Sequence, residues 1–187
     1  MSDAADILSA APGPRLARAA QGRAAAFVVT ACESGSLHMR MLGERPEAFG
    51  SLVRERLMAG ALAPSSFYIG AQKLRRLLSN ELAELFRSYD VLIAPAAPCE
   101  APLLGADAIE VEGQSMPARS AIGMFTQALA LAGVPVGVAP NPGAGLPVGV
   151  QVICPPWRED LVLRVLAVLE SEGFAADLFP GGMRGSP

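Results

Sequence analysis

The clearest pattern of hydrophobic and polar positions runs from Ser66 to Tyr89. Apolar side chains recur there every three or four residues, which places them on one face of an α-helix, while most arginines and glutamates lie off that face. The apolar stripe consists of Phe67, Ala71, Leu74, Leu78, Leu82, Leu85 and Tyr89. The pattern therefore predicts a long amphipathic helix that begins at Ser65 or Ser66.

Four shorter segments also predict helices. Ala24–Glu33 is typical of a short buried helix, and Ser34-Gly35-Ser36 is expected to break it. A second helix is predicted from Pro46, a favourable first residue, to Gly60. The segments 119–131, followed by Gly133, and 158–172, followed by Gly173, complete the set.

Strand signals lie between these helices. Val91-Leu92-Ile93-Ala94 is a continuous apolar run closed by Pro95, as in a strand buried on both faces. Residues 95–117 are rich in Pro, Gly and Ala and predict an ordered loop with one small hairpin. The runs 134–138 and 146–150 echo each other across a Pro/Gly turn cluster, which predicts an antiparallel hairpin. The expected fold class is α/β, with too few strands for a complete sheet.

The domain organisation follows from these elements. Residues 1–23 are expected to form a loosely ordered lead-in, residues 24–176 the folded portion, and residues 177–187 a flexible tail. Ser120–Trp157 carries no charge, yet its many prolines and glycines exclude a membrane-spanning helix. This block is expected to be the innermost part of a soluble fold. Because few other elements could cover a central hairpin, we also predict a large exposed apolar patch.

Composition narrows the classes of function. Of the 187 residues, 51% are hydrophobic and 18% charged, with a net charge of −3, which excludes the basic surface of a nucleic-acid-binding protein. Three widely spaced cysteines and one histidine favour reduced thiols in the cytoplasm over disulfides or a zinc site. The acidic N-terminus does not resemble an export signal. We expect no metal and no cofactor.

Candidate nucleophiles lack suitable partners in the sequence. Lys73 is the only lysine, and it follows Ser65 and Ser66 by seven or eight helical residues, or roughly 10.5–12 Å. Activation of a serine by a lysine requires hydrogen-bond reach, so this pair is not expected to act. Cys99 could pair only with His38, which lies in an unrelated segment.

Five segments in order resemble the last third of the amidase signature family, which hydrolyses carboxamide bonds. They are Phe67–Arg75, Tyr89–Pro98, Phe125–Gln127, Leu131–Pro135 and Gly145–Ile153. Ala24–Gly35 is similar to the segment that precedes these in the carboxybiuret-hydrolase-like branch. The resemblance implies a mixed sheet wrapped by helices, with a central antiparallel hairpin.

The same resemblance implies a Ser–Ser–Lys mechanism whose residues lie in the family's N-terminal half, so no catalytic residue is carried over to this chain. Four polar side chains interrupt apolar stretches and are candidates for substrate binding: Tyr68, Thr126, Gln127 and Gln151. Each could equally be a core polar group whose hydrogen bonds are satisfied.

Three hypotheses follow. The first is the C-terminal portion of an amidase-type hydrolase, which forms the substrate side of the cleft, binds a small amide once completed, and is inactive alone. The second is a non-catalytic binding or scaffold subunit that meets a protein partner, or another copy, through its apolar face. The third is an independent hydrolase that uses Ser65 or Ser66 with Lys73. No nucleic-acid or membrane partner is expected.

Overall fold

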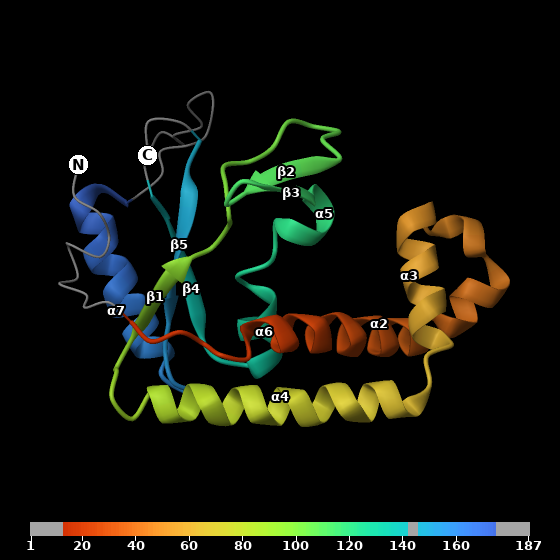
Figure 1. Ribbon diagram of the computed structural model, residues 1–187, viewed down its shortest axis with the longest axis horizontal. Helices are drawn as coiled ribbons and strands as arrows, with labels where there is room; N and C mark the ends of the chain where they lie inside the picture. The colour runs from red at the N-terminus through yellow and green to blue at the C-terminus, as the bar shows by residue number, and fades with distance from the viewer. Residues whose placement is uncertain (1–12, 142–145, 175–187) are drawn as a thin grey trace, which may run out of the picture. The chain divides into compact units, whose positions relative to one another are not determined.

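The computed structural model describes residues 13–141 and 146–174. In chain order the elements are α2 (Ala19–Glu44), η1 (Pro46–Ala48), α3 (Ser51–Ala61), α4 (Ser65–Leu85), β1 (Leu92–Pro95), β2 (Ala108–Val111), β3 (Gln114–Pro117), α5 (Ala118–Ala121), α6 (Gln127–Ala132), β4 (Val136–Asn141), β5 (Val148–Ile153), α7 (Glu159–Leu169) and η2 (Glu170–Phe174). They form two compact units, shown in Figure 1: a helical unit of Arg15–Leu85 with Thr126–Gly133, and a sheet unit that holds the other described elements.

The sheet unit contains an antiparallel three-stranded sheet in the order β1-β5-β4. The central strand β5 pairs with both neighbours, so that Ile153 lies opposite Leu92 on one side and Val136 on the other. The predicted hairpin between residues 134–138 and 146–150 is thereby confirmed as β4 and β5. The apolar run predicted as a strand forms β1, although its residues are only half-buried or exposed.

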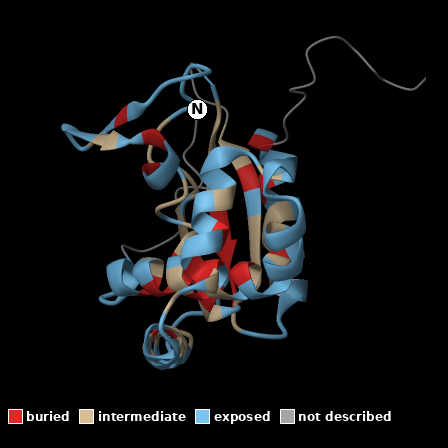
Figure 2. Cartoon of the chain, turned by 90° about the vertical axis from the view of Figure 1, so that its right-hand side faces the viewer, coloured by how far each residue is buried: buried red, intermediate tan, exposed pale blue. Residues whose placement is uncertain are grey.

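Helix α7 covers one face of this sheet (Figure 1). The shared core, part of the red in Figure 2, consists of Ala139, Val152, Cys154, Val162, Leu169 and Phe174. Gly137 allows the helix to approach, since a Cβ atom there would lie 2.5 Å from Val162 Cγ1 and 2.6 Å from Leu166 Cδ1. Side chains alternate between the faces of a strand, so Val138 points the other way, and it is 53% exposed.

The uncharged block is only partly internal. Val152, Ile153 and Cys154 are buried, whereas Trp157 is 89% exposed. The expectation that the whole of Ser120–Trp157 is innermost is therefore wrong, because the segment leaves the sheet before α7 begins. No helix in the described ranges is long and apolar enough to cross a membrane.

A second, two-stranded sheet confirms the small hairpin predicted within residues 95–117. Strands β2 and β3 pair from Ala108↔Pro117 to Val111↔Gln114. The turn between them, Glu112-Gly113, has positive φ at both positions, as tight two-residue hairpins require. Helix α5 packs on this hairpin.

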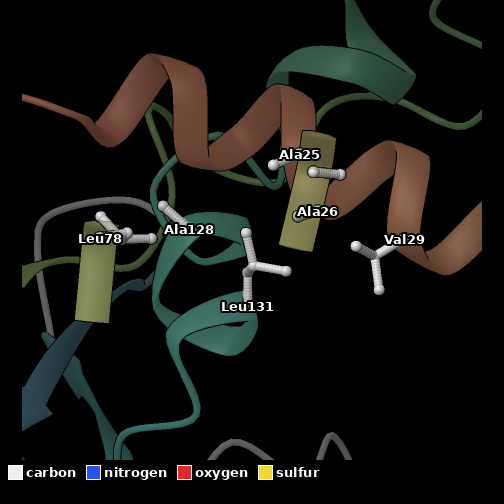
Figure 3. Packing of buried hydrophobic residues seen from close by; sticks show 7 residues of the cluster. Ala25, Ala26, Val29, Leu78, Ala128 and Leu131 are labelled. Carbon is white, nitrogen blue, oxygen red and sulfur yellow. The ribbon is translucent and has the colours of Figure 1, made fainter. Parts of the chain in front are cut away.

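The helical unit is built on two long helices that lie alongside each other, α2 and α4, with α6 packed against both (Figure 1). Figure 3 shows the core that they share, in which Ala25 and Val29 of α2 meet Leu78 of α4 and Leu131 of α6. The stripe predicted from the sequence is buried in its middle at Ala71, Leu78 and Leu82. At the start of α4 it is not, because Phe67 is 63% exposed.

The predicted break at Ser34-Gly35-Ser36 is wrong. Helix α2 continues through it to Glu44 and begins at Ala19, within the predicted lead-in. Gly35 serves a packing purpose, since a Cβ atom there would lie 2.5 Å from Ala61 N and 2.6 Å from Leu57 O. The glycine allows α3 to press against the backbone of α2 without ending the helix.

The single helix predicted over Arg119–Leu131 is also wrong, because α5 and α6 are separate. The residues of the two helices are buried in different cores: Ala121 packs on the small hairpin, whereas Ala128 and Leu131 pack in the helical unit. Gly133 ends α6 as predicted, with φ of 76° and its N–H donating to Leu129 O. The last predicted helix is confirmed as α7 followed by η2. The predicted tail, residues 177–187, lies outside the described residues.

Candidate functional site

The helical unit contains a surface cleft of about 320 Å³. Four helices contribute to it, α2, α3, α4 and α6. Its lining residues are Ala26, Phe27, Val29, Thr30, Glu33, Arg56, Arg75, Gln127, Ala130 and Leu131. The apolar members continue the core of Figure 3 outwards, and the polar members come from each of the four helices. The cleft therefore combines a hydrophobic floor with converging polar groups, as small-molecule sites do.

Two guanidinium groups line this cleft. Arg56 of α3 lies over the ring of Phe27, with its Cζ atom 4.6 Å from the ring centroid. Arg75 of α4 has no side-chain hydrogen bond or ion pair within the described part of the chain. Two arginines without carboxylate partners leave the cleft able to bind an anionic group.

A hydrogen-bonded chain forms the opposite wall. Gln72 Nε2 donates to Tyr68 Oη at 2.9 Å, and Tyr68 Oη donates to Glu33 Oε1 at 2.8 Å. Glu33 lines both the cleft and a second, more apolar hollow of about 510 Å³ that is bordered by Cys32, Ser36, Leu37 and Tyr68. The Glu33 carboxylate is thus held by one oxygen at the junction of two hollows.

The predicted site residues are distributed over both units. Gln127, the first residue of α6, lines the cleft, and its Oε1 accepts a hydrogen bond from Arg23 Nε at 3.2 Å. Thr126 immediately precedes it at the start of α6. Tyr68 borders the second hollow. Three of the four candidates therefore belong to the helical unit.

Gln151 belongs to the sheet unit, on the central strand β5. It is 1% exposed, and its Nε2 donates to Pro95 O at 2.8 Å and, more weakly, to Phe125 O at 3.4 Å. Both of its amide hydrogens are thereby directed at backbone carbonyls. The arrangement ties two chain segments to the central strand.

Sequence reasoning did not single out Glu33, Arg56 or Arg75. A signal for Glu33 exists, since Ala26, Val29 and Glu33 recur at helical spacing on one face of α2. The expected helix break after Glu33 concealed that continuity. No local pattern distinguishes Arg56 and Arg75 from the other exposed arginines.

The thiols and the serine–lysine pair do not assemble into a nucleophilic site. Burial, with a contribution from Asp160, raises the pKa of the Cys154 thiol. Cys99 and His38 lie in different units, and the His38 ring packs against Phe49 at 5.6 Å. Lys73 is exposed and shares the helix α4 with Ser65 and Ser66, which confirms the separation of roughly 10.5–12 Å along one axis. Within the described ranges, no three His, Cys, Asp or Glu side chains are grouped to hold a metal ion.

The sequence matches the family model described as Amidase over residues 9–163. The chain belongs to the amidase family. It is 47% identical over 157 residues to the 1-carboxybiuret hydrolase protein AtzE of Pseudomonas sp. (strain ADP), a match that covers 82% of this chain and 34% of the relative. It is 38% identical to a glutamyl-tRNA(Gln) amidotransferase chain of Neisseria meningitidis serogroup C (strain 053442), a match that covers 66% of this chain and 26% of the relative.

Solved amidases share the fold. A structure described as "An unexpected vestigial protein complex reveals the evolutionary origins of an s-triazine catabolic enzyme" has a TM-score of 0.86 at 45% identity and covers 92% of this chain and 38% of its own. A crystal structure of an amidase has a TM-score of 0.79 at 31% identity and covers 83% and 36%. The chain thus spans about a third of the length of the amidases that it matches.

Proposed function

We propose that this chain forms the substrate side of an amide hydrolase, which cleaves a carboxamide C–N bond with water to give a carboxylate and an amine or ammonia. The observation that carries the proposal is the cleft of the helical unit, where Gln127, Arg75 and Glu33 converge over an apolar floor. Membership of the amidase family supports the type of bond, and the cleft supports a role in substrate binding.

The charges of the cleft suggest the class of amide. Arg56 and Arg75 are suited to a carboxylate, because a guanidinium presents several N–H donors to both carboxylate oxygens. The relative AtzE is named for 1-carboxybiuret, an amide that carries such a group. We therefore propose a small anionic amide as the substrate, with Tyr68, Thr126 and Gln127 near it and Gln151 fixing the sheet unit.

The chemical step is assigned to groups outside this chain. A serine nucleophile needs a base within hydrogen-bond reach, and Lys73 lies about two helical turns from Ser65 and Ser66. The chain is accordingly expected to be inactive until a segment that bears the nucleophile is supplied.

A second candidate is a non-catalytic binding or scaffold subunit derived from an amidase. Two observations favour it: a similar solved structure is described as a vestigial protein complex, and Val138 is 53% exposed on the sheet face opposite α7. In this alternative a protein partner covers that apolar face.

Amide turnover distinguishes these functions. The purified chain is assayed for ammonia release from 1-carboxybiuret, alone and mixed with the segment of Pseudomonas AtzE that it does not match. We expect no turnover alone and turnover on mixing. Stable association without turnover would favour the scaffold. Turnover by the chain alone that disappears in Ser66→Ala or Ser65→Ala would overturn both proposals in favour of an independent hydrolase.

A further inference from the structure

Glu33 has one carboxylate oxygen engaged and one available. Oε1 accepts the hydrogen bond from Tyr68 Oη at 2.8 Å, and no other hydrogen bond or ion pair to Glu33 occurs within the described part of the chain. The side chain nevertheless lines the cleft together with Arg56 and Arg75. A carboxylate that faces two guanidinium groups across a cleft without pairing with either is available to a ligand.

The side chain of Glu33 is also oriented. Tyr68 and Gln72 lie one turn apart on α4, and the bond from Gln72 Nε2 to Tyr68 Oη directs the phenol hydrogen towards Glu33. A tyrosine that accepts one hydrogen bond tends to donate its own hydrogen elsewhere. The chain Gln72–Tyr68–Glu33 therefore fixes an acceptor oxygen in a cleft whose other charged groups are donors.

We propose that Glu33 is a specificity residue, whose second carboxylate oxygen accepts a hydrogen bond from an N–H group of an amide bound in the cleft, and that Tyr68 positions it. This inference rests on the proposed function, since it assumes that the cleft takes a small anionic amide. An ionised carboxylate only accepts hydrogen bonds, so it favours ligands with N–H groups over N-alkylated ones. The arginines bind the anionic end, and Glu33 reads the amide nitrogen.

Two matched probes test this role in binding alone. Succinamate carries a carboxylate and two amide N–H donors, whereas N,N-dimethylsuccinamate carries the same carboxylate and none. Dissociation constants are measured by NMR titration of the whole chain. We expect the chain to bind succinamate about tenfold more tightly, as one charge-assisted hydrogen bond allows.

The variants separate recognition from structure. In Glu33→Ala the preference for succinamate falls to about one, and in Glu33→Gln, which keeps an uncharged acceptor, it falls to roughly threefold. Tyr68→Phe lowers the preference without abolishing it, because the acceptor remains but is no longer held. Glu47→Gln, an exposed change in η1 outside the cleft, keeps the full preference.

Three results would overturn the inference: no saturable binding of succinamate, equal affinity of the unaltered chain for both probes, or an undiminished preference in Glu33→Ala. None of them depends on turnover, so the hydrolase proposal could survive each one. Conversely, a lack of turnover on mixing with the AtzE segment would leave a Glu33-dependent preference intact.

Discussion

A Cβ atom on Gly60 would lie 1.8 Å from the carbonyl oxygen of Ala31, so α3 and α2 cross in backbone contact. Gly35 makes the reciprocal approach, with a Cβ position 2.6 Å from Leu57 O. The neighbours in both places are backbone atoms, which cannot rotate away as the end of a side chain can. The crossing positions Arg56 of α3 beside Phe27 of α2, and thereby one wall of the cleft.

Gly60→Ala is expected to lower the free energy of unfolding by about 1–3 kcal/mol, because the added methyl group forces the two helices apart. Urea denaturation followed by circular dichroism measures the change. Gly70→Ala is the matched control, since this glycine also lies inside a helix and a Cβ atom there would meet nothing within 4 Å. The control should gain about 0.5–1 kcal/mol from helix propensity. Equal effects of the two substitutions would contradict the close crossing.

The same glycines show where sequence reasoning stops. The stripe on α4 is predictable because its helical period is local, and Leu78 and Leu82 are buried as expected. Gly35 has the same local signature whether it ends a helix or accommodates a neighbouring one. Only the position of α3 decides, and that position depends on residues far along the chain.

The candidate site follows the same division. Gln127 is recognisable as a polar residue in an apolar stretch, and it does line the cleft. Arg75 lies off the apolar stripe of α4, as any solvent-facing arginine does. It becomes part of a cleft only because α2 and α6 pack beside α4, which no pattern within α4 reveals.

Gln151→Leu is expected to destabilise the chain by about 1–3 kcal/mol, because the carbonyl oxygens of Pro95 and Phe125 lose their donor. Gln151→Glu should cost more, since it buries an acceptor against two acceptors at a position that is 1% exposed. Thermal unfolding monitored by circular dichroism ranks the variants. Gln114→Glu, on the exposed edge of the small hairpin, serves as the control and should change little. Tolerance of Gln151→Glu would mean that this side chain is not a core group.

Cys154 is expected to make the chain less stable at high pH. Burial raises the pKa of its thiol above the ordinary value of 9.0, so above about pH 9 the unfolded state releases this proton while the folded state keeps it. The free energy of unfolding should fall as the pH rises through that range. Cys154→Ser removes this part of the slope, whereas Cys32→Ser retains it. Slopes that are identical in both variants would contradict the assignment.

The exposed Arg158–Asp160 pair gives the opposite dependence on pH. The hydrogen bond from Arg158 Nε, at 2.9 Å, lowers the pKa of the Asp160 carboxyl below its ordinary 3.8. Its stabilisation is therefore present above about pH 3.8 and is lost as the pH falls through the lowered value. Asp160→Asn should remove a small acid-labile part of the stability, and Asp107→Asn should not. Acid titration followed by circular dichroism compares the two, and an Asp160→Asn curve that overlies the unaltered one would show that the pair contributes nothing.

Arg75 and Glu33 should act on different ends of a bound ligand. Arg75→Gln is expected to weaken the binding of succinamate by roughly three- to tenfold, because the cleft loses a partner for the carboxylate at an exposed position. It should weaken N,N-dimethylsuccinamate equally, so the preference between the two probes stays unchanged. Arg76→Gln, the adjacent exposed arginine outside the cleft lining, should alter neither constant. A loss of preference in Arg75→Gln would show that both ends of the ligand are recognised as one unit, and unaltered affinity would place the anion elsewhere.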